Sequence, residues 1–316
     1  MINISIIIPC YNTSQYIDKC ICSLCKQTFK GTIELIFVDD CSSDGTILII
    51  EQLLKEYSYT GNYKIIKHTE NKGVAEARIT GILSAVGEYI LFCDSDDWMD
   101  ERMCEMMYSE AINFNSSLVV CDYRNIYSSY DNVSLNNYVE DYLQGLLLCK
   151  CTGSLWNKLI KRELLLTKEF VYPHASFSED YVYSIQLAIL ADKIRYVPEP
   201  LYNYYHRDGS LVMSTNEIAI QRRIQENLAN HRLVEDILKK YQLFDRYYSE
   251  SLALKLIIKN YIRAYLPRPG YYQLWKDTYP EMTIDIFKSR HIKFHTKVAY
   301  FLTLFGVYPY LKKFIH

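Results

Sequence analysis

The first hundred residues alternate between short, almost entirely apolar runs and longer segments in which apolar residues recur at helical spacing. The apolar runs cover residues 2–8, 33–38, 63–68 and 88–93, and the helical segments lie between and after them. Strands that are apolar on both faces, each followed by a helix, are typical of a parallel sheet with helices on both sides. The pattern therefore predicts an α/β fold, a mostly parallel sheet flanked by helices.

The pattern becomes looser after residue 100. Residues 117–123 are typical of another strand, and residues 153–165 and 179–192 have the spacing of helices. Residues 194–207 contain Pro198 and Pro200, which predicts an edge strand or an extended segment. Residues 124–150 are polar and give no clear pattern.

The last hundred residues are helical in character. Residues 216–241 and 249–266 have helical spacing, and Pro267 ends the second of these segments. We therefore expect one domain over residues 1–215 and a C-terminal helical extension over residues 216–316.

The segment 291–316 is basic at both ends and apolar between them. Its uninterrupted apolar stretch, residues 298–311, is too short to span a bilayer. Lysine and aromatic residues beside an apolar face favour a helix that lies on a membrane surface, whereas a terminal helix packed on the protein would have the same pattern. Both interpretations remain open at this point.

Charge and cysteine content narrow the class of protein. The formal net charge is −2, which gives no electrostatic case for binding nucleic acid. The ten cysteines follow no disulfide framework and the N-terminus has no export signal, so we expect a cytoplasmic protein. The cluster Cys20, Cys22, Cys25 has helical surroundings, and at this spacing the three thiols point to different faces and cannot share a metal.

Carboxylates follow the expected strands where those strands end. The run ending at Cys93 continues into Asp94, Asp96 and Asp97, and residues 33–38 continue into Asp39 and Asp40. Ligands of open α/β sheets bind beyond the carboxyl ends of the strands, and clustered carboxylates suit a divalent cation that substrate phosphates also bind. A solvated acidic loop is the alternative.

A calcium loop of the EF-hand type is a second alternative for the acidic cluster. Such a loop would need an oxygen ligand at position 98 and glycine at position 99, where this chain has Trp98 and Met99. We therefore exclude it.

Several motifs together resemble the family 2 glycosyltransferases, which have the GT-A fold. The resemblance covers residues 1–215, and the helical extension lies outside it. The matching segments are SIIIPCYNTSQYI (5–17), QTF (27–29), IFVDDCSSDGT (36–46), NKGVAEARITGI (71–82), ILFCDSDDWMD (90–100), WNKLIKREL (156–164), FSED (177–180) and HRDGSLVMS (206–214). One departure is Cys41, where the family more often has glycine.

The resemblance implies a role for each matching residue. Asp180 corresponds to the catalytic base, with Glu179 beside it, and Asp96 with Asp94 corresponds to the D-x-D motif that holds Mn²⁺ or Mg²⁺. The residues expected to bind the donor are Pro9, Tyr11, Asp40, Asn71, Arg78, Asp94, Ser95, Arg207 and Ser210. An acidic first turn of the helix 179–192 would explain Glu179 and Asp180 without catalysis, and Trp156 suits packing as well as acceptor stacking.

The implied activity is an inverting, metal-dependent transfer of a hexosyl or N-acetylhexosaminyl group in the synthesis of a polysaccharide such as a capsule. The donor would be a nucleotide sugar, a UDP-sugar in particular, and the acceptor a saccharide or lipid-linked saccharide. A lipid-linked acceptor would suit peripheral contact of residues 291–316 with the inner face of the cell membrane. Two alternatives are a sugar-phosphate nucleotidyltransferase, against which the glycine-free segment PCYNTSQY argues, and a non-catalytic nucleotide-sugar-binding module.

Overall fold

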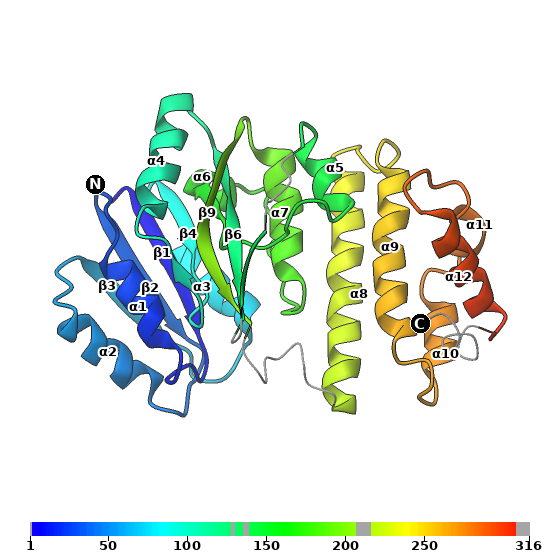
Figure 1. Ribbon diagram of the computed structural model, residues 1–316, viewed down its shortest axis with the longest axis horizontal. Coiled ribbons are helices and arrows are strands. Elements are labelled where there is room, and N and C mark those ends of the chain that lie inside the picture. Colours follow the sequence, from blue (N-terminus) through cyan, green and yellow to red (C-terminus); the bar gives the residue numbers. More distant parts are fainter. Residues whose placement is uncertain (1, 128–129, 135–138, 207–215, 308–316) are drawn as a thin grey trace. The chain divides into compact units, whose positions relative to one another are not determined.

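The computed structural model describes residues 2–127, 130–134, 139–206 and 216–307. The chain packs into two compact units (Figure 1). The first comprises Met1–Tyr138 and Thr152–Ser214, and the second comprises Val139–Cys151 and Thr215–His316. The domain boundary expected between residues 215 and 216 stays a prediction, but the segment 139–151 packs with the C-terminal helices.

The first unit begins with the expected alternation of strands and helices. Its parallel strands, in the spatial order β3-β2-β1-β4, are β1 (Ile4–Cys10), β2 (Ile33–Asp39), β3 (Asn62–Lys67) and β4 (Tyr89–Phe92). The helices that connect them are α1 (Ile17–Cys25), α2 (Thr46–Glu56) and α3 (Val74–Ser84). The α/β class is therefore confirmed, with the sheet flanked by helices as expected.

Both faces of β1 are buried, which explains why that strand is mostly apolar. Ile4, Ile6 and Ile8 pack into the core cluster that includes residues of α1, α2 and α4 (Met103–Phe114). Ile7 points to the other face, where α3 crosses it closely. A Cβ on Gly81 of α3 would lie 2.3 Å from Cγ2 of Ile7, so glycine is required for this approach.

The sheet continues on the other side of β4 with mixed strand directions. The order is β4-β8-β6-β9-β5, formed by β8 (Lys158–Lys161), β6 (Leu118–Ile126), β9 (Ile194–Tyr205) and β5 (Trp98–Met99), and β7 (Asp131–Ser134) pairs with β6. β8 is antiparallel to both β4 and β6, whereas β9 is parallel to β6.

The helix expected over residues 153–165 was a wrong prediction. Residues 158–161 form β8, and only α6 (Arg162–Leu166) is helical. The apolar residues of this segment are buried on both sides of a central strand, and for such a short run periodicity does not distinguish a strand from a helix.

The two prolines of β9 lie where its pairing with β6 is irregular. The register shifts on both sides of Asp122, opposite residues 198–200. Beyond this irregularity β9 also pairs with β5 through Tyr202 and Asn203. The prolines therefore mark a bulge, which is one of the positions that a sheet tolerates for proline.

The remaining helices include α7 (Glu179–Leu190) of the first unit and α5 (Tyr142–Leu147) of the second. The second unit also contains α8 (Glu217–Lys240), α9 (Tyr248–Arg263), α10 (Tyr271–Asp277), α11 (Met282–Asp285) and α12 (Phe294–Leu304). The helices expected at 216–241 and 249–266 are thus present. Within the described residues, every helix is too short or too polar to cross a bilayer.

Candidate active site

The expected site residues lie at the carboxyl ends of β1, β2 and β4. In the parallel register Cys10 is the partner of Asp39, and Ile7 is the partner of Phe92, so these strands end at the same edge of the sheet (Figure 1). Asp40 and Asp94 follow β2 and β4 at this edge. The topology therefore brings carboxylates from distant parts of the sequence together.

The turn after β4 is held by a buried carboxylate. Asp97 accepts hydrogen bonds from the hydroxyl of Tyr202 (2.8 Å) and from the backbone N–H of Tyr205 (2.7 Å). The Tyr202 oxygen in turn accepts from the backbone N–H of Asp94 (3.0 Å). Burial, together with the nearby charges of Asp96 and Asp94, raises the pKa of Asp97 well above its ordinary value. Asp97 and Tyr202 thus fix the backbone that carries Asp94 and Asp96.

Arg78 of α3 joins two acidic segments of the site. Its Nη2 donates to Oδ1 of Asp94 at 2.9 Å, and its Nη1 is bonded to Oε1 of Glu179. Both Arg78 and Glu179 are buried. Burial lowers the pKa of Arg78, but the carboxylates of Asp94 and Asp180 outweigh this and raise it overall. A permanent positive charge therefore holds the turn after β4 against the start of α7.

Asp180 lies in the first turn of α7. Ser178, two residues before Asp180, has a φ of 66°, in the left-handed region. The Asp180 carboxylate accepts from the backbone N–H of Tyr181 at 2.8 Å. Burial raises the pKa of Asp180, and the charges of Arg78 and Lys158 only partly oppose this effect. A carboxylate with a raised pKa is a better proton acceptor than an ordinary aspartate, as a catalytic base requires.

Both carboxylate oxygens of Asp40 are hydrogen-bonded to other groups of the chain. Its Oδ1 is bonded to the ring Nδ1 of His68 (2.7 Å) and to the N–H of Lys72 (2.8 Å), and its Oδ2 accepts from the N–H of Gly73 (2.7 Å). A Cβ on Gly73 would lie 2.3 Å from Oγ of Ser176, so this loop packs closely against the segment before α7. Asp40 thus fixes the loop that leads into α3. Its contact with the donor's base stays a prediction.

The remaining expected donor-binding residues lie along the same edge or outside the described residues. Pro9 is in β1 opposite Val38, Tyr11 is exposed directly after β1, and Ser95 is buried in the turn after β4. Asn71 is exposed just before α3. Arg207 and Ser210 fall outside the residues that the structure describes.

Cys41 shows why the family more often has glycine at this position. Its φ of 64° lies in the left-handed region, which glycine adopts without strain. The neighbouring Asp39 accepts from the N–H of Ser42 at 3.3 Å. The loop after β2 therefore has the conformation that glycine favours, although a cysteine occupies the position.

Asp94 and Asp96 are the residues that the sequence predicts to hold a divalent metal ion. Within the described ranges, no group of three or more His, Cys, Asp or Glu side chains is arranged to hold an ion by itself. Two carboxylates on one turn, whose charges already raise the pKa of Asp97, fit a site that substrate oxygens complete. The residues present therefore fit Mn²⁺ or Mg²⁺ bound together with a diphosphate.

Two features of the site escaped the sequence reasoning. Lys158 lies in the segment taken as helical, yet it is fully buried and donates to the backbone carbonyl of Thr152 at 3.1 Å. Tyr204 of β9 is half-buried, and burial, followed by the charges of Asp97, Asp94, Asp96 and Asp180, raises its pKa to about 12. The alternation of aromatic residues in YNYYH at 202–206 was the available signal for Tyr204.

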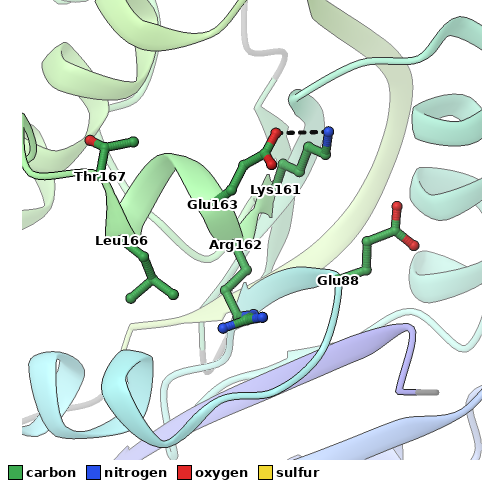
Figure 2. Close-up of a pocket in the computed structure, with 6 residues that line it drawn as sticks. All are labelled: Glu88, Lys161, Arg162, Glu163, Leu166 and Thr167. Carbon is green, nitrogen blue, oxygen red and sulfur yellow. Dashed lines mark ion pairs between the residues drawn. The ribbon is translucent and has the colours of Figure 1, made fainter.

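A pocket elsewhere in the first unit is distinct from this site (Figure 2). Its lining includes Glu88, Arg162 and the ion pair between Lys161 and Glu163, whose charged atoms are 2.8 Å apart. Glu88 precedes β4, whereas Asp94 follows it, so the pocket lies at the opposite edge of the sheet. It contains none of the residues expected to bind donor or metal.

Comparison with known proteins shows which family the chain resembles. Residues 5–179, more than half of the chain, match the family model described as glycosyl transferase family 2. The protein EpsH of Bacillus subtilis is 33% identical over 220 residues, which cover 66% of this chain and 62% of EpsH. The match thus spans less than two thirds of that relative's length.

Solved structures with the same fold include two glycosyltransferases. TarS of Staphylococcus aureus, a poly(ribitol-phosphate) β-N-acetylglucosaminyltransferase, is 26% identical over 275 residues, which cover 81% of this chain and 47% of TarS. The structure of its residues 1–349 with UDP-GlcNAc has a TM-score of 0.60 at 20% identity and covers 83% of this chain and 81% of that one. The mannosyltransferase PcManGT of Pyrobaculum calidifontis, with GDP-Man and Mn²⁺, has a TM-score of 0.57 at 16% identity and covers 97% and 87%.

Proposed function

Because the chain belongs to glycosyltransferase family 2, we propose that it is an inverting, metal-dependent glycosyltransferase. It moves a hexosyl or N-acetylhexosaminyl group from a nucleotide sugar to a saccharide or lipid-linked saccharide acceptor in polysaccharide synthesis. The observation that carries the proposal is Arg78, which holds the turn bearing Asp94 and Asp96 against the helix end bearing Asp180. This arrangement supports a diphosphate site beside a catalytic base.

The donor is proposed to be a UDP-sugar, which binds along the carboxyl ends of β1, β2 and β4. The uracil base of the donor would lie near Pro9, Tyr11 and the loop after β2. Asn71 would lie beside that loop. The complex of TarS with UDP-GlcNAc supports this choice of nucleotide. Ligands of open α/β sheets bind at this edge, which supports the position.

Asp94 and Asp96 would hold the metal ion together with the diphosphate. When bound, Mn²⁺ or Mg²⁺ stabilises the negative charge of the departing nucleoside diphosphate. Arg78 orients Asp94 through its 2.9 Å bond and compensates the carboxylate charge on the protein side. The pairing of PcManGT with GDP-Man and Mn²⁺ supports this role of the D-x-D residues.

Asp180 is proposed as the base that accepts the proton of the attacking acceptor hydroxyl. Burial raises its pKa, which makes it a stronger proton acceptor, and the nearby Arg78 charge favours its ionised form. A single in-line attack inverts the anomeric carbon and needs no covalent intermediate on the enzyme. Glu179, which is bonded to Arg78, positions the start of α7.

The test is the release of UDP from UDP-GlcNAc and UDP-glucose by the purified full chain with Mn²⁺. Removing a general base typically costs a factor of about 10² to 10⁴, so Asp180→Asn should lose transfer to saccharide probes by at least about 10² and retain UDP binding. Asp96→Asn should lose Mn²⁺-dependent UDP release. The control Asp192→Asn, beyond the other end of α7, should behave as wild type.

Two results would contradict this proposal in different ways. Normal transfer by Asp180→Asn would show that another group is the base. A wild-type protein that releases no nucleotide from any nucleotide sugar, with Mn²⁺ or Mg²⁺, would show that the chain is not an active transferase.

We also propose that the C-terminal segment contacts the inner face of the cell membrane. Large apolar side chains are exposed on and beside α11 and α12, including Ile284 (73%), Phe294 (79%) and Phe305 (70%). Lys288, Arg290, Lys293 and Lys297 accompany them in the same stretch, where Asp285 is the acidic residue. Exposed apolar residues with lysines suit an anionic lipid surface.

Vesicle sedimentation tests this contact. The full chain should sediment with vesicles that contain phosphatidylserine, and the double variant Phe294→Ser, Phe305→Ser should stay in the supernatant. The matched control is Leu48→Ser, Leu83→Ser, which removes two exposed leucines of the first unit. If all three proteins sediment alike, or none does, the proposed contact is wrong.

A further inference from the structure

One face of the strand pair β6–β9 carries a row of aromatic side chains. Tyr123 is the register partner of Tyr202, and two residues further Asn125 is the partner of Tyr204. Because side chains alternate along a strand, Tyr202, Tyr204 and His206 lie on the same face. Sequence reasoning singled out Trp156 for packing or acceptor stacking, and this side chain lies against the same row.

The rings of the row are in direct contact with one another. Trp156 stacks on Tyr202 with ring centres 4.5 Å apart and on Tyr204 at 5.7 Å. Tyr204 meets His206 edge to face at 4.6 Å, and His206 stacks on Tyr127 at 4.1 Å. Tyr202 and Trp156 are buried, whereas Tyr204, His206 and Tyr127 are half-buried. The row therefore leads from the core of the sheet toward solvent.

Tyr204 is the member of this row that lies beside the turn bearing Asp94 and Asp96. Tyr202 and Tyr205, on either side of it in β9, both bond to Asp97 of that turn, through the Tyr202 hydroxyl (2.8 Å) and the Tyr205 N–H (2.7 Å). The Tyr202 oxygen also accepts from the N–H of Asp94 at 3.0 Å, and Tyr204 lies on the same face of the strand as Tyr202. The ring of Tyr204 is half-exposed at this position.

The position of Tyr204 in the sheet separates it from the expected nucleotide site. The strands β1 and β2, whose ends would hold the nucleotide, lie on one side of β4, and β9 lies on the other. An acceptor must reach the base from the side that the nucleotide leaves free. The aromatic row lies on that side.

We propose that Tyr204 forms the acceptor subsite, where a sugar ring of the saccharide acceptor stacks on its face and a sugar hydroxyl accepts from its phenol. This inference rests on the proposed function. Aromatic rings carry a negative face that attracts the polarised C–H groups of a pyranose, and the phenol supplies one directional contact. The Trp156 ring stacks on the Tyr204 ring, so the Tyr204 ring is held in place before the acceptor binds.

The experiment compares donor hydrolysis with transfer in the full chain. UDP release from UDP-GlcNAc and UDP-glucose with Mn²⁺ is measured alone and with p-nitrophenyl glycosides of glucose, galactose and N-acetylglucosamine as acceptor probes. Tyr204→Leu keeps an apolar side chain against Trp156 but removes the aromatic face. We expect its KM for the stimulating glycoside to rise by at least about tenfold, while hydrolysis without acceptor stays within about twofold of wild type; the KM change corresponds to about 1.4 kcal/mol.

Two further variants distinguish an acceptor platform from a structural ring. Tyr204→Phe keeps the face and should show a smaller rise in KM than Tyr204→Leu. Tyr205→Leu, on the opposite face of β9 where its ring lies 6.1 Å from that of Trp98, should leave the KM unchanged. The thermal unfolding midpoint of each variant is measured in parallel.

Three outcomes would overturn the inference. The first is an unchanged acceptor KM in Tyr204→Leu. The second is an equal loss of donor hydrolysis, acceptor use and thermal stability, which indicates a structural ring. The third is a wild-type protein that hydrolyses the donor but responds to no glycoside. A wild-type protein without donor hydrolysis contradicts the proposed function itself and is distinguishable from all three.

Discussion

The environment of Asp180 that suits catalysis also disfavours the charged form of its carboxyl group in the folded protein. Burial raises the pKa of this carboxyl, and Arg78 and Lys158 offset only part of the effect. A carboxyl group whose pKa is higher in the folded than in the unfolded chain lowers stability as the pH rises through these two values. The full cost is present at a pH above both values, and at a pH below both values it vanishes.

Asp180→Asn should therefore be inactive yet at least as stable as wild type at pH 7.5. The stability difference should disappear at about pH 2.5, well below the ordinary aspartate pKa of about 3.9, where the carboxyl group is protonated in both states. Thermal unfolding at the two pH values in metal-free buffer measures this. A variant less stable than wild type at pH 7.5 would show that the ionised carboxylate stabilises the fold. The same raised pKa predicts that wild-type activity falls at a pH above the ordinary aspartate range as the solution is acidified.

Cys41 stores backbone strain that glycine would relieve. Its φ of 64° costs a residue with a Cβ about 1 to 2 kcal/mol, whereas glycine loses about 0.5 to 1 kcal/mol through its greater freedom in the unfolded chain. Cys41→Gly should therefore raise the free energy of unfolding by about 0.5 to 1 kcal/mol. Urea unfolding measures this, with Cys41→Ala as the control that keeps the strain. Equal stability of the two variants would contradict the strain argument.

The elements that sequence predicted correctly are those whose local pattern and tertiary position agree. β1 and β2 are buried and mostly apolar because helices cover both faces, and α3 begins where Asp40 fixes Gly73. β8 could not be predicted in this way, because its pairing with β4 and β6 depends on segments about 40 to 70 residues earlier in the chain.

In the site too, some residues can be proposed from short sequence motifs, whereas the contacts between them depend on the fold. Asp94, Asp96 and Asp180 could be proposed from motifs that lie within a few residues. The bonds of Arg78 to Asp94 and Glu179 span 16 and 101 positions, and no sequence pattern shows them. Tyr204 escaped for the same reason, since its ring neighbour Trp156 comes from the segment just before β8.

Within β8, the buried Lys158 and the partly exposed Lys161 offer a direct comparison. Lys158 donates to the carbonyl of Thr152 (3.1 Å) and to Oδ1 of Asn157 (3.0 Å), and it is fully buried. Lys161 ends the same strand and pairs with Glu163 at 2.8 Å, with 31% of its side chain exposed. The first lysine therefore organises the loop before β8, and the second contributes a surface pair.

Lys158→Met should lower the free energy of unfolding by about 3 kcal/mol, because it leaves several buried acceptors without their charged donor. Lys161→Met should cost less than about 1 kcal/mol, as exposed ion pairs do. Urea unfolding of both variants provides the comparison. Similar small losses for the two would show that water or another group replaces the Lys158 ammonium.

At the scale of the whole molecule, the two compact units do not correspond to two continuous stretches of the chain, because the second unit includes Val139–Cys151. Helix α5 comes from the middle of the sequence but packs on α9 of the second unit. Asp141 accepts from the Tyr247 hydroxyl at 2.8 Å, and the Gln144 amide donates to Glu250 at 2.8 Å. Within residues 124–150, which gave no clear pattern, β7 pairs with the nearby β6, whereas Asp141 and Gln144 have partners 106 positions further along the chain.

This division predicts that a chain ending at residue 214 will not behave as a complete domain. Leu143, Leu146 and Leu147 of α5 are buried, and each apolar side chain of this size loses about 2 kcal/mol when it returns to water. The shortened chain should bind the dye ANS and aggregate at concentrations where the full chain does not aggregate. Replacing the three leucines with glutamine in the shortened chain should reduce both effects. A shortened chain that is monomeric without these replacements would show that α5 finds its packing within residues 1–214, and that the C-terminal helices are an addition to an already complete catalytic unit.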